Sequence, residues 1–433
     1  MPITGSPAGA GTPRFARSLA AAFILTAGTV VATTPAHATN GYFANGYGAP
    51  SKAQAGAGVA HGEGPLASAQ NPALGVQVGN VAGLCFTGFM PHRYTDSAAG
   101  GAMVPGKVKS DNEFFPIVCG GVNYMLDNDT SLGLVMFGNG GMNTEYDTNV
   151  FANFNGGTAE STPLGMDMAQ AFFALNAAHR LTPTVSIGAA PVLAVQRFKA
   201  YGLEPFAGSS TDAAHLTNNG YDWSVGGGFK LGATWDAAKW VTLGVNYQSR
   251  MWMQPFEKYK GLFAEGGDFD IPSTVGVGAA FKPDDRWIVS LEYQRIFYNE
   301  ISSVSNSHVR SGGSLALGSD NGAGFGWKDM DIFRIGAEFK ATDSLTLRTG
   351  FSHASKFADN QEVLFNVLAP ATVRTHAGAG FTYRFNETWS VTGSYLHAFS
   401  ESLTGTNPAM APNDSTKLQM DQDEVSLGFS YKF

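Results

Sequence analysis

The chain has 433 residues, of which 54 are glycine, 12% are aromatic and only 14% are charged. This composition is too aromatic for a disordered chain and too poor in charge for the surface of an ordinary soluble protein. The formal net charge of −8 argues against nucleic acid and against an anionic membrane surface as partners.

The first segment has the pattern of an export signal. Arg14 and Arg17 precede an apolar run of small residues at 19–32, and Ala36-His37-Ala38 has the form that signal peptidase cleaves. We therefore expect a signal peptide at residues 1–38 and a mature chain that begins at Thr39.

Residues 39–76 follow, and they are rich in glycine and alanine without helical or strand periodicity. Ordering glycine costs more backbone entropy than ordering any other residue, so this segment does not form a stable element alone. It is either a flexible linker or a plug that surrounding walls hold in place. Because the sequence offers no second domain before it, the plug is the favoured interpretation.

Residues 77–433 consist of short segments in which apolar and polar residues alternate. In the last of them, Val425, Leu427, Phe429, Tyr431 and Phe433 fall on one face and polar or small residues on the other. This alternation is typical of a strand with one apolar face. A β-sandwich shares the pattern, but its outer face should carry more Lys and Glu than the Gly, Ser, Thr and Asn found here.

The links between the segments alternate in length. Short polar links lie near residues 127–129, 182–184, 236–238, 283–286, 341–344 and 386–387. Long links lie near residues 92–111, 142–163, 201–220, 252–268, 299–327, 355–372 and 400–421. Bacterial outer-membrane barrels have short periplasmic turns and long extracellular loops, so the links predict about fourteen antiparallel strands. The seven tryptophans lie near strand ends, as an aromatic girdle requires: Trp223, Trp235, Trp240, Trp252, Trp287, Trp327 and Trp389.

The predicted fold is therefore an all-β transmembrane barrel with an N-terminal hatch, or plug, inside its lumen. Side chains alone nearly fill an eight-stranded barrel, whereas sixteen or more strands leave an aqueous channel. Residues 39–76 could occupy the wide lumen of the predicted barrel, because irregular backbone is tolerated at membrane depth when protein surrounds it.

Several pieces of the sequence resemble the FadL-type family of outer-membrane transporters for long-chain fatty acids and related hydrophobic compounds. They are Asn40-Gly41-Tyr42-Phe43, Asn71-Pro72-Ala73, the segment 243–249, Asp270-Ile271-Pro272-Ser273 and the terminal Phe433. The resemblance implies a fourteen-stranded barrel with a hatch and a substrate captured near the extracellular loops. It also implies that the hatch shifts to open a route and that a kinked strand offers a lateral exit into the membrane.

The resemblance directs attention to three sets of residues. Asn71, Pro72 and Ala73 are candidates for hatch gating. Gly138, Gly140 and Gly141 are candidates for the strand kink, because glycine within a strand favours bulges, although an ordinary strand end is an equal alternative. Phe151 and Phe154, in the following long link, are candidates for the apolar capture surface; they could equally pack on neighbouring loops.

A fatty-acid carboxylate would need a cationic partner in an apolar pocket. Strand parity places Arg250, Arg334 and Arg348 on the lumen side, and they are the candidate substrate contacts. The alternative is that they pair with lumen carboxylates such as Glu292 and Glu338, as arginines inside barrels usually do.

The sequence contains no G-x-S-x-G, H-E-x-x-H or P-loop motif and no metal-ligand spacing, so we expect neither an enzyme nor a cofactor. Cys85 and Cys119 fall in the first two predicted strands. They form either a cross-strand disulfide or two free thiols, and the sequence leaves both open.

We conclude that the sequence predicts a monomeric outer-membrane channel for passive uptake of hydrophobic small molecules, with long-chain fatty acids as the first candidates. Aromatic or aliphatic hydrocarbons are the alternative substrates, and an adhesin or structural barrel is the alternative function. The expected partners are the substrate, outer-membrane lipids with lipopolysaccharide, and the barrel assembly machinery during biogenesis.

Overall fold

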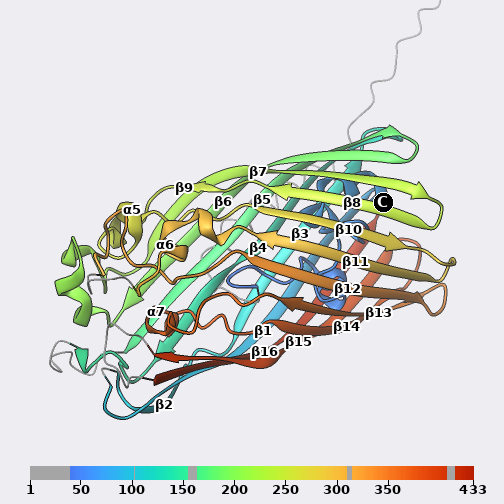
Figure 1. Ribbon diagram of the computed structural model, residues 1–433. Coiled ribbons are helices and arrows are strands. Elements are labelled where there is room, and N and C mark those ends of the chain that lie inside the picture. The colour runs from blue at the N-terminus through green and yellow to red at the C-terminus, as the bar shows by residue number, and fades with distance from the viewer. Residues whose placement is uncertain (1–39, 102, 155–162, 310–314, 407–414) are drawn as a thin grey trace, which may run out of the picture. The chain divides into compact units, whose positions relative to one another are not determined.

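The computed structural model describes residues 40–101, 103–154, 163–309, 315–406 and 415–433. In this part of the chain, fourteen strands build a wall: β1 (Val81–Ser97), β3 (Phe115–Met125), β4 (Thr130–Tyr146), β5 (Leu164–Thr182), β6 (Val185–Tyr201), β7 (Asp222–Ala238), β8 (Val241–Gln248), β10 (Thr274–Phe281), β11 (Trp287–Ile296), β12 (Met330–Lys340), β13 (Leu345–Ala354), β14 (Thr375–Arg384), β15 (Trp389–Thr406) and β16 (Ser415–Lys432). Each strand pairs antiparallel with the next, and β16 pairs with β1 from Val81↔Lys432 to Ser97↔Thr416, which closes a barrel. The strands run obliquely across Figure 1, with short turns at one end and long loops at the other.

Two short strands lie beside this wall. β2 (Gly106–Lys109) forms a hairpin with the outer end of β1, and β9 (Trp252–Met253) pairs with β7. Both lie toward the long-loop end of the barrel in Figure 1.

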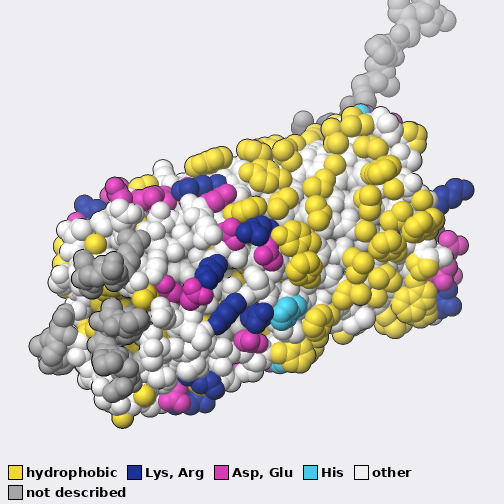
Figure 2. Space-filling view, viewed as in Figure 1, with side chains coloured by type: hydrophobic (Ala, Val, Ile, Leu, Met, Phe, Trp, Pro, Cys, Tyr) yellow, Lys and Arg dark blue, Asp and Glu magenta, His cyan; other side chains and the backbone are white. Residues whose placement is uncertain are grey.

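The outside of the barrel carries a broad apolar band. Alternate residues of each strand face outward, as Val425, Leu427 and Phe429 do on β16, and these side chains are exposed although they are hydrophobic. Figure 2 shows the band over the half of the barrel nearer the short turns, with charged side chains beyond it on both sides. A band of this kind matches the hydrocarbon core of a bilayer.

Trp327 does not belong to the predicted aromatic girdle. Its side chain is buried, 5.8 Å between ring centroids from Tyr42 of the hatch, and its indole nitrogen donates to the Asn366 side chain at 2.6 Å. Its position near a strand end wrongly predicted a place in the girdle, because the long loop before β12 turns inward.

Residues 40–79 lie inside the barrel as the N-terminal hatch and contain four short helices: α2 (Ala49–Ala53), α3 (Ala67–Gln70), η1 (Pro72–Leu74) and α4 (Gly75–Val78). Inward-facing glycines let the hatch backbone approach the wall. A Cβ atom at Gly188 would lie 2.4 Å from the carbonyl carbon of Pro72, and one at Gly350 would lie 2.3 Å from that of Gln54. The predicted antiparallel barrel of about fourteen strands is confirmed, with an N-terminal helical segment in its lumen.

Within the described residues, the long loops carry the other helices: η3 (Glu204–Ser209), η4 (Ala213–His215), η5 (Glu257–Tyr259), α5 (Ala264–Gly267), η6 (Tyr298–Glu300), α6 (Ser302–Ser305) and α7 (Val363–Asn366). These loops fold over the same end of the barrel in Figure 1 and pack into one apolar cluster with the hatch. Across the described residues, no helix has the length and apolar character needed to cross a membrane.

Candidate functional site

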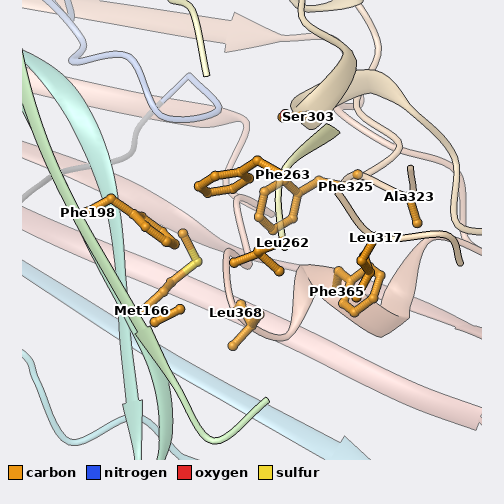
Figure 3. A pocket seen from close by; sticks show the side chains of 12 residues that line it. Met166, Phe198, Leu262, Phe263, Ser303, Leu317, Ala323, Phe325, Phe365 and Leu368 are labelled. Carbon is orange, nitrogen blue, oxygen red and sulfur yellow. The ribbon is translucent and has the colours of Figure 1, made fainter. Parts of the chain in front are cut away.

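An apolar cavity lies between the long loops and the ends of β5 and β6 nearest to them. Its volume is about 30 Å³, and its walls come from β5, β6 and three long loops. The lining residues are Met166, Phe198, Ala200, Leu262, Phe263, Ser303, Leu317, Ala323, Gly324, Phe325, Phe365 and Leu368. In Figure 3 the labelled aromatic and aliphatic side chains point toward one another across this space.

The cavity is chemically uniform. Among the lining residues, Ser303 alone has a polar side chain. Its hydroxyl already donates a hydrogen bond to the backbone carbonyl of Asp268. A space of this size holds only one or two water molecules, so a substrate with a ring or a chain would enter only if the loops move apart. The site can bind apolar molecules and offers no charge to a head group.

Phe151 and Phe154, the predicted capture residues, do not line this cavity. They contact the lining residues indirectly, through a series of packed aromatic rings. The Phe151 ring lies 5.0 Å from that of Phe206, and Phe206 lies 5.3 Å from Phe365, which does line the cavity. The loop that holds Phe151 is thus connected to the cavity wall through packed rings.

The barrel wall is interrupted between β3 and β4. The two strands pair only from Gly120↔Met136 to Met125↔Ser131. Farther out, β4 pairs with β5 and not with β3, and its register with β5 shifts between Gly138 and Gly140, so that Asn139 is an extra residue. The wall joins again near the loops, where the Asp111 amide donates to the Glu145 carbonyl at 2.8 Å. The glycines selected from the sequence thus lie at a β-bulge beside this wall opening.

The start of the hatch covers the opening from inside. The Ala44 amide donates to the Asn139 carbonyl and the Gly141 amide donates to the Tyr42 carbonyl, both at 2.8 Å. A Cβ atom at Gly140 would lie only 1.6 Å from the Tyr42 oxygen, so glycine is required for this approach. These bonds satisfy backbone groups of β4 that β3 leaves unpaired. We call residues 40–44 the hatch strand.

Asn71, Pro72 and Ala73 lie deep in the interface between the hatch and β5–β8. The Asn71 amide donates to the carbonyls of Val59, Ala233 and Val245 at 2.7, 3.2 and 3.3 Å. Its oxygen accepts from the Ala73 amide at 3.0 Å, which caps the short helix η1. This one side chain therefore joins two parts of the hatch to two strands of the wall.

Two of the three predicted arginine contacts fasten the hatch. Arg334 binds the Glu292 carboxylate at 2.9 Å, and the same carboxylate accepts the Gly58 and Val59 amides of the hatch at 2.8 and 2.9 Å. Arg348 binds both Glu338 of the wall, at 3.0 Å, and Glu63 of the hatch, at 2.5 Å. Neither arginine lines the apolar cavity.

Arg250 lies at the outer mouth and pairs with Asp270 at 2.5 Å and Asp268 at 3.4 Å. Burial and the neighbouring charge of Asp270 raise the pKa of the Asp268 carboxyl to about 6. All three arginines thus have carboxylate partners within the protein, which was the alternative considered for them.

The structure joins Cys85 and Cys119 by a disulfide between β1 and β3, with Cα atoms 5.0 Å apart. Among the residues that the structure describes, no cluster of three or more His, Cys, Asp or Glu side chains could hold a metal ion.

Sequence reasoning missed Phe263, Phe325 and Phe365, which line the cavity. They come from loops as far apart in the sequence as positions 263 and 365 and have no common spacing. The sequence signal that could have found them is the presence of phenylalanines in long loops, where polar residues are expected.

Known outer-membrane proteins share this fold. The family model described as outer membrane protein transport protein (OMPP1/FadL/TodX) matches residues 28–433. The toluene transporter TodX of Pseudomonas putida has 17% identity and a TM-score of 0.68, over 90% of this chain and 99% of that one. A FadL homologue of Pseudomonas aeruginosa has 14% identity and a TM-score of 0.67, over 91% of this chain and all of that one.

A curated relative is the 47 kDa outer membrane protein of Pasteurella multocida (strain Pm70), which is 27% identical over 146 residues. The match covers 32% of this chain and 32% of that relative, so it spans about a third of each. The family model, in contrast, covers nearly the whole chain. This protein belongs to the OMPP1/FadL/TodX family of transport proteins and resides in the outer membrane.

Proposed function

We propose that the protein admits small hydrophobic molecules passively through the outer membrane, and that neutral hydrocarbons, aromatic ones first, are its substrates. The observation that carries the proposal is the apolar cavity, whose lining includes no charged side chain. Its walls include aromatic rings, which offer edge and face contacts to an aromatic ligand. The toluene transporters among its structural relatives support the same substrate class.

We propose that substrate leaves sideways through the wall opening between β3 and β4. This route needs only the hatch strand to move, because β3 and β4 already lack mutual pairing there. Three features support it: the bulge at Asn139, the hatch strand that covers the opening, and Pro116 on the β3 side. Proline has no amide hydrogen and is confined to strand edges, which suits a position with no neighbour to bond.

A second candidate substrate is a long-chain fatty acid, and one observation favours it. Lys230 is buried on the inner wall, where its ammonium lies 5.4 and 5.5 Å from the ring centroids of Tyr47 and Phe137. It donates to the backbone carbonyl of Ala69, and no carboxylate of the described residues lies within 4.0 Å of it. Since buried charges are usually paired, Lys230 could bind a substrate carboxylate beside the opening.

Growth and uptake separate the two substrate classes. A deletion strain should lose growth on limiting toluene, or at least grow several-fold more slowly, while growth on oleate stays normal. The Lys230→Met variant should leave toluene uptake unchanged. If the deletion strain grows normally on toluene but fails on oleate, the fatty-acid alternative replaces the hydrocarbon proposal.

The cavity itself is tested by filling it. Ala323→Trp places a large side chain in the cavity, and we expect toluene uptake into proteoliposomes to fall at least tenfold. Ala214→Trp, on an exposed loop position, is the matched control and should have no effect. Equal uptake by the two variants would contradict passage through this cavity.

A further inference from the structure

One side of the wall opening is a stretch of β3 that pairs with β1 and not with β4. From Phe115 to Cys119, β3 pairs with β1 between Phe89↔Phe115 and Cys85↔Cys119, but it does not pair with β4. Lipid cannot replace the missing partner, because hydrocarbon offers no hydrogen bonds to a backbone. A segment held by one ladder opens more easily than one held by two.

The disulfide lies at the point where β3 and β4 separate. Gly120↔Met136 is the last pair between these strands, and Cys119 is the next residue of β3. Its sulfur is bound to that of Cys85, which is its register partner on β1. The cross-link therefore stands at the base of the singly paired segment.

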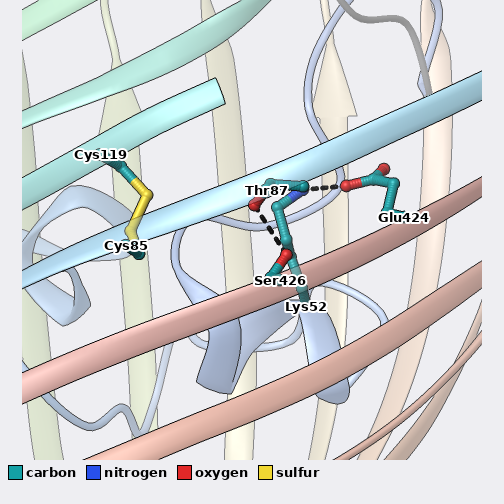
Figure 4. The surroundings of a disulfide bond; sticks show 6 residues. All are labelled: Lys52, Cys85, Thr87, Cys119, Glu424 and Ser426. Atoms are coloured by element: carbon teal, nitrogen blue, oxygen red, sulfur yellow. Dashed lines mark hydrogen bonds and ion pairs between the residues drawn. A yellow bond between two sulfur atoms is a disulfide. The ribbon is translucent and has the colours of Figure 1, made fainter. Parts of the chain in front are cut away.

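Both cysteines face the hatch. The neighbours of Cys85 along β1, Leu84 and Phe86, are exposed on the outer surface, whereas both cysteines are buried in the cluster that includes Leu66 of the hatch. Figure 4 shows the disulfide between its two strands with hatch helices behind it. A movement of the hatch would therefore act directly on this part of the wall.

We propose that the Cys85–Cys119 disulfide is a positioning element that holds the free edge of β3 on β1 and so fixes the width of the wall opening. The proposal rests on the lateral exit proposed above. With the bond in place, displacement of the hatch strand uncovers an opening of constant size. Without it, the β1 ladder alone holds the segment from Phe115 to Cys119, so this edge fluctuates more and the opening admits larger molecules.

The test compares Cys85→Ser/Cys119→Ser with wild type in proteoliposomes. We expect amide hydrogen exchange within 115–119 to rise at least tenfold, with no change within 121–123, where β3 has two partners. Uptake of an anthracene-sized probe relative to toluene should rise at least threefold. That ratio is informative because a general loss of stability would lower both uptake rates together.

Thr87 and Ser426 provide the matched control. Their hydroxyls form a 2.7 Å hydrogen bond between β1 and β16, on the same inner face as Cys85 and at a seam that is paired along its whole length. Thr87→Val/Ser426→Ala should change neither the exchange within 115–119 nor the uptake ratio.

Unchanged exchange and an unchanged uptake ratio in a correctly folded double serine variant would overturn the proposal. If that variant fails to form the heat-modifiable folded barrel, the folded wild type is reduced with a phosphine and the same two quantities are measured, with the same expectations. If wild type takes up neither probe, the proposed substrate class fails, but the exchange measurement still decides whether the disulfide holds β3.

Discussion

Asn71 shows how one side chain can connect the hatch to the barrel wall. Its amide and oxygen bind Val59 and Ala73 within the hatch and two carbonyls of β7 and β8. Removing this donor leaves the buried Val59 carbonyl unpaired, at a cost of about 1–3 kcal/mol, whereas Ala233 and Val245 keep their strand pairing, so the loss is small beside the pairing energy of a closed barrel. The position of the hatch therefore depends on Asn71 more than the stability of the barrel does.

We expect Asn71→Ala to change the toluene uptake rate at least threefold while the heat-modifiable folded band remains. The reason is that only hatch contacts and the η1 cap are lost. Gln77→Ala is the control, because it removes one hatch-to-wall hydrogen bond, to Thr234, at an exposed position. Loss of the folded band in Asn71→Ala would instead make Asn71 a residue of the barrel fold.

Asp268 gives the extracellular mouth a pH dependence. Its pKa is raised from the ordinary value of 3.8 to about 6, so the folded loop binds this proton more tightly than an unfolded loop does. The stability of the loop therefore falls as the pH rises from about 4 to 6, and the full penalty is present above that range. The groups that face Asp268 are Arg250, Asp270 and Glu265.

Local hydrogen exchange between residues 254 and 272 tests this sign. After correction for intrinsic rates, wild-type protection should decrease between pH 4 and pH 7. Asp268→Asn, which mimics the protonated carboxyl, should remove most of that decrease. An identical pH profile in both proteins would show that another group controls the loop.

Among the elements, the hatch is attached to the wall unevenly. Its ion pairs with the wall join Glu63 to Arg348 and Arg384, His61 to Glu338, and Lys52 to Glu424, all on β12–β16. β4, in contrast, holds residues 42–47 of the hatch through neutral groups. The backbone of Asn139 and Gly141 bonds to Ala44 and Tyr42, and the Asn139 amide oxygen accepts from the Tyr47 hydroxyl at 3.1 Å.

Glu292→Gln should loosen the charged side of the hatch. The change leaves Arg334 buried without its carboxylate, which typically costs 3–5 kcal/mol, and weakens the acceptor of two hatch amides. We expect frequent conductance bursts in planar bilayers, where wild type is quiet. Asp331→Asn is the control, since its partnership with Arg295 is partly exposed on the outer wall.

The elements differ in how far the sequence could predict them. Alternation such as that of β16 and the unequal links predicted the barrel and its strand number, because each strand has one apolar face whatever its neighbours are. The hatch was predictable from its glycine content once a lumen was available to hold it. The three cavity phenylalanines, Phe263, Phe325 and Phe365, and the pairing of Arg334 with Glu292 depend on how distant loops and strands meet, and no local pattern contains that information.

At the scale of the whole molecule, the apolar band fixes how the barrel lies in the membrane. Leu427 lies within the band on β16, and Thr404 faces outward on β15 nearer the loops. Leu427→Arg should lower the unfolding free energy in lipid vesicles by about 2–4 kcal/mol, because a charge then meets hydrocarbon. Thr404→Arg should cost at most about 1 kcal/mol.

These two free energies are measured by denaturant titration of the barrel in vesicles. Equal costs for the two substitutions would mean that the band does not mark the bilayer, and that the barrel lies at another depth.

The uneven attachment of the hatch has a consequence for the cell envelope. If only the neutral contacts at β4 break, the hatch pivots on its charged side and continues to block the axis of the barrel. The passage that opens then leads into the lipid phase and never connects the two aqueous compartments. An oily molecule could cross while ions, sugars and water-soluble antibiotics remain outside, so transport and the permeability barrier would not compete.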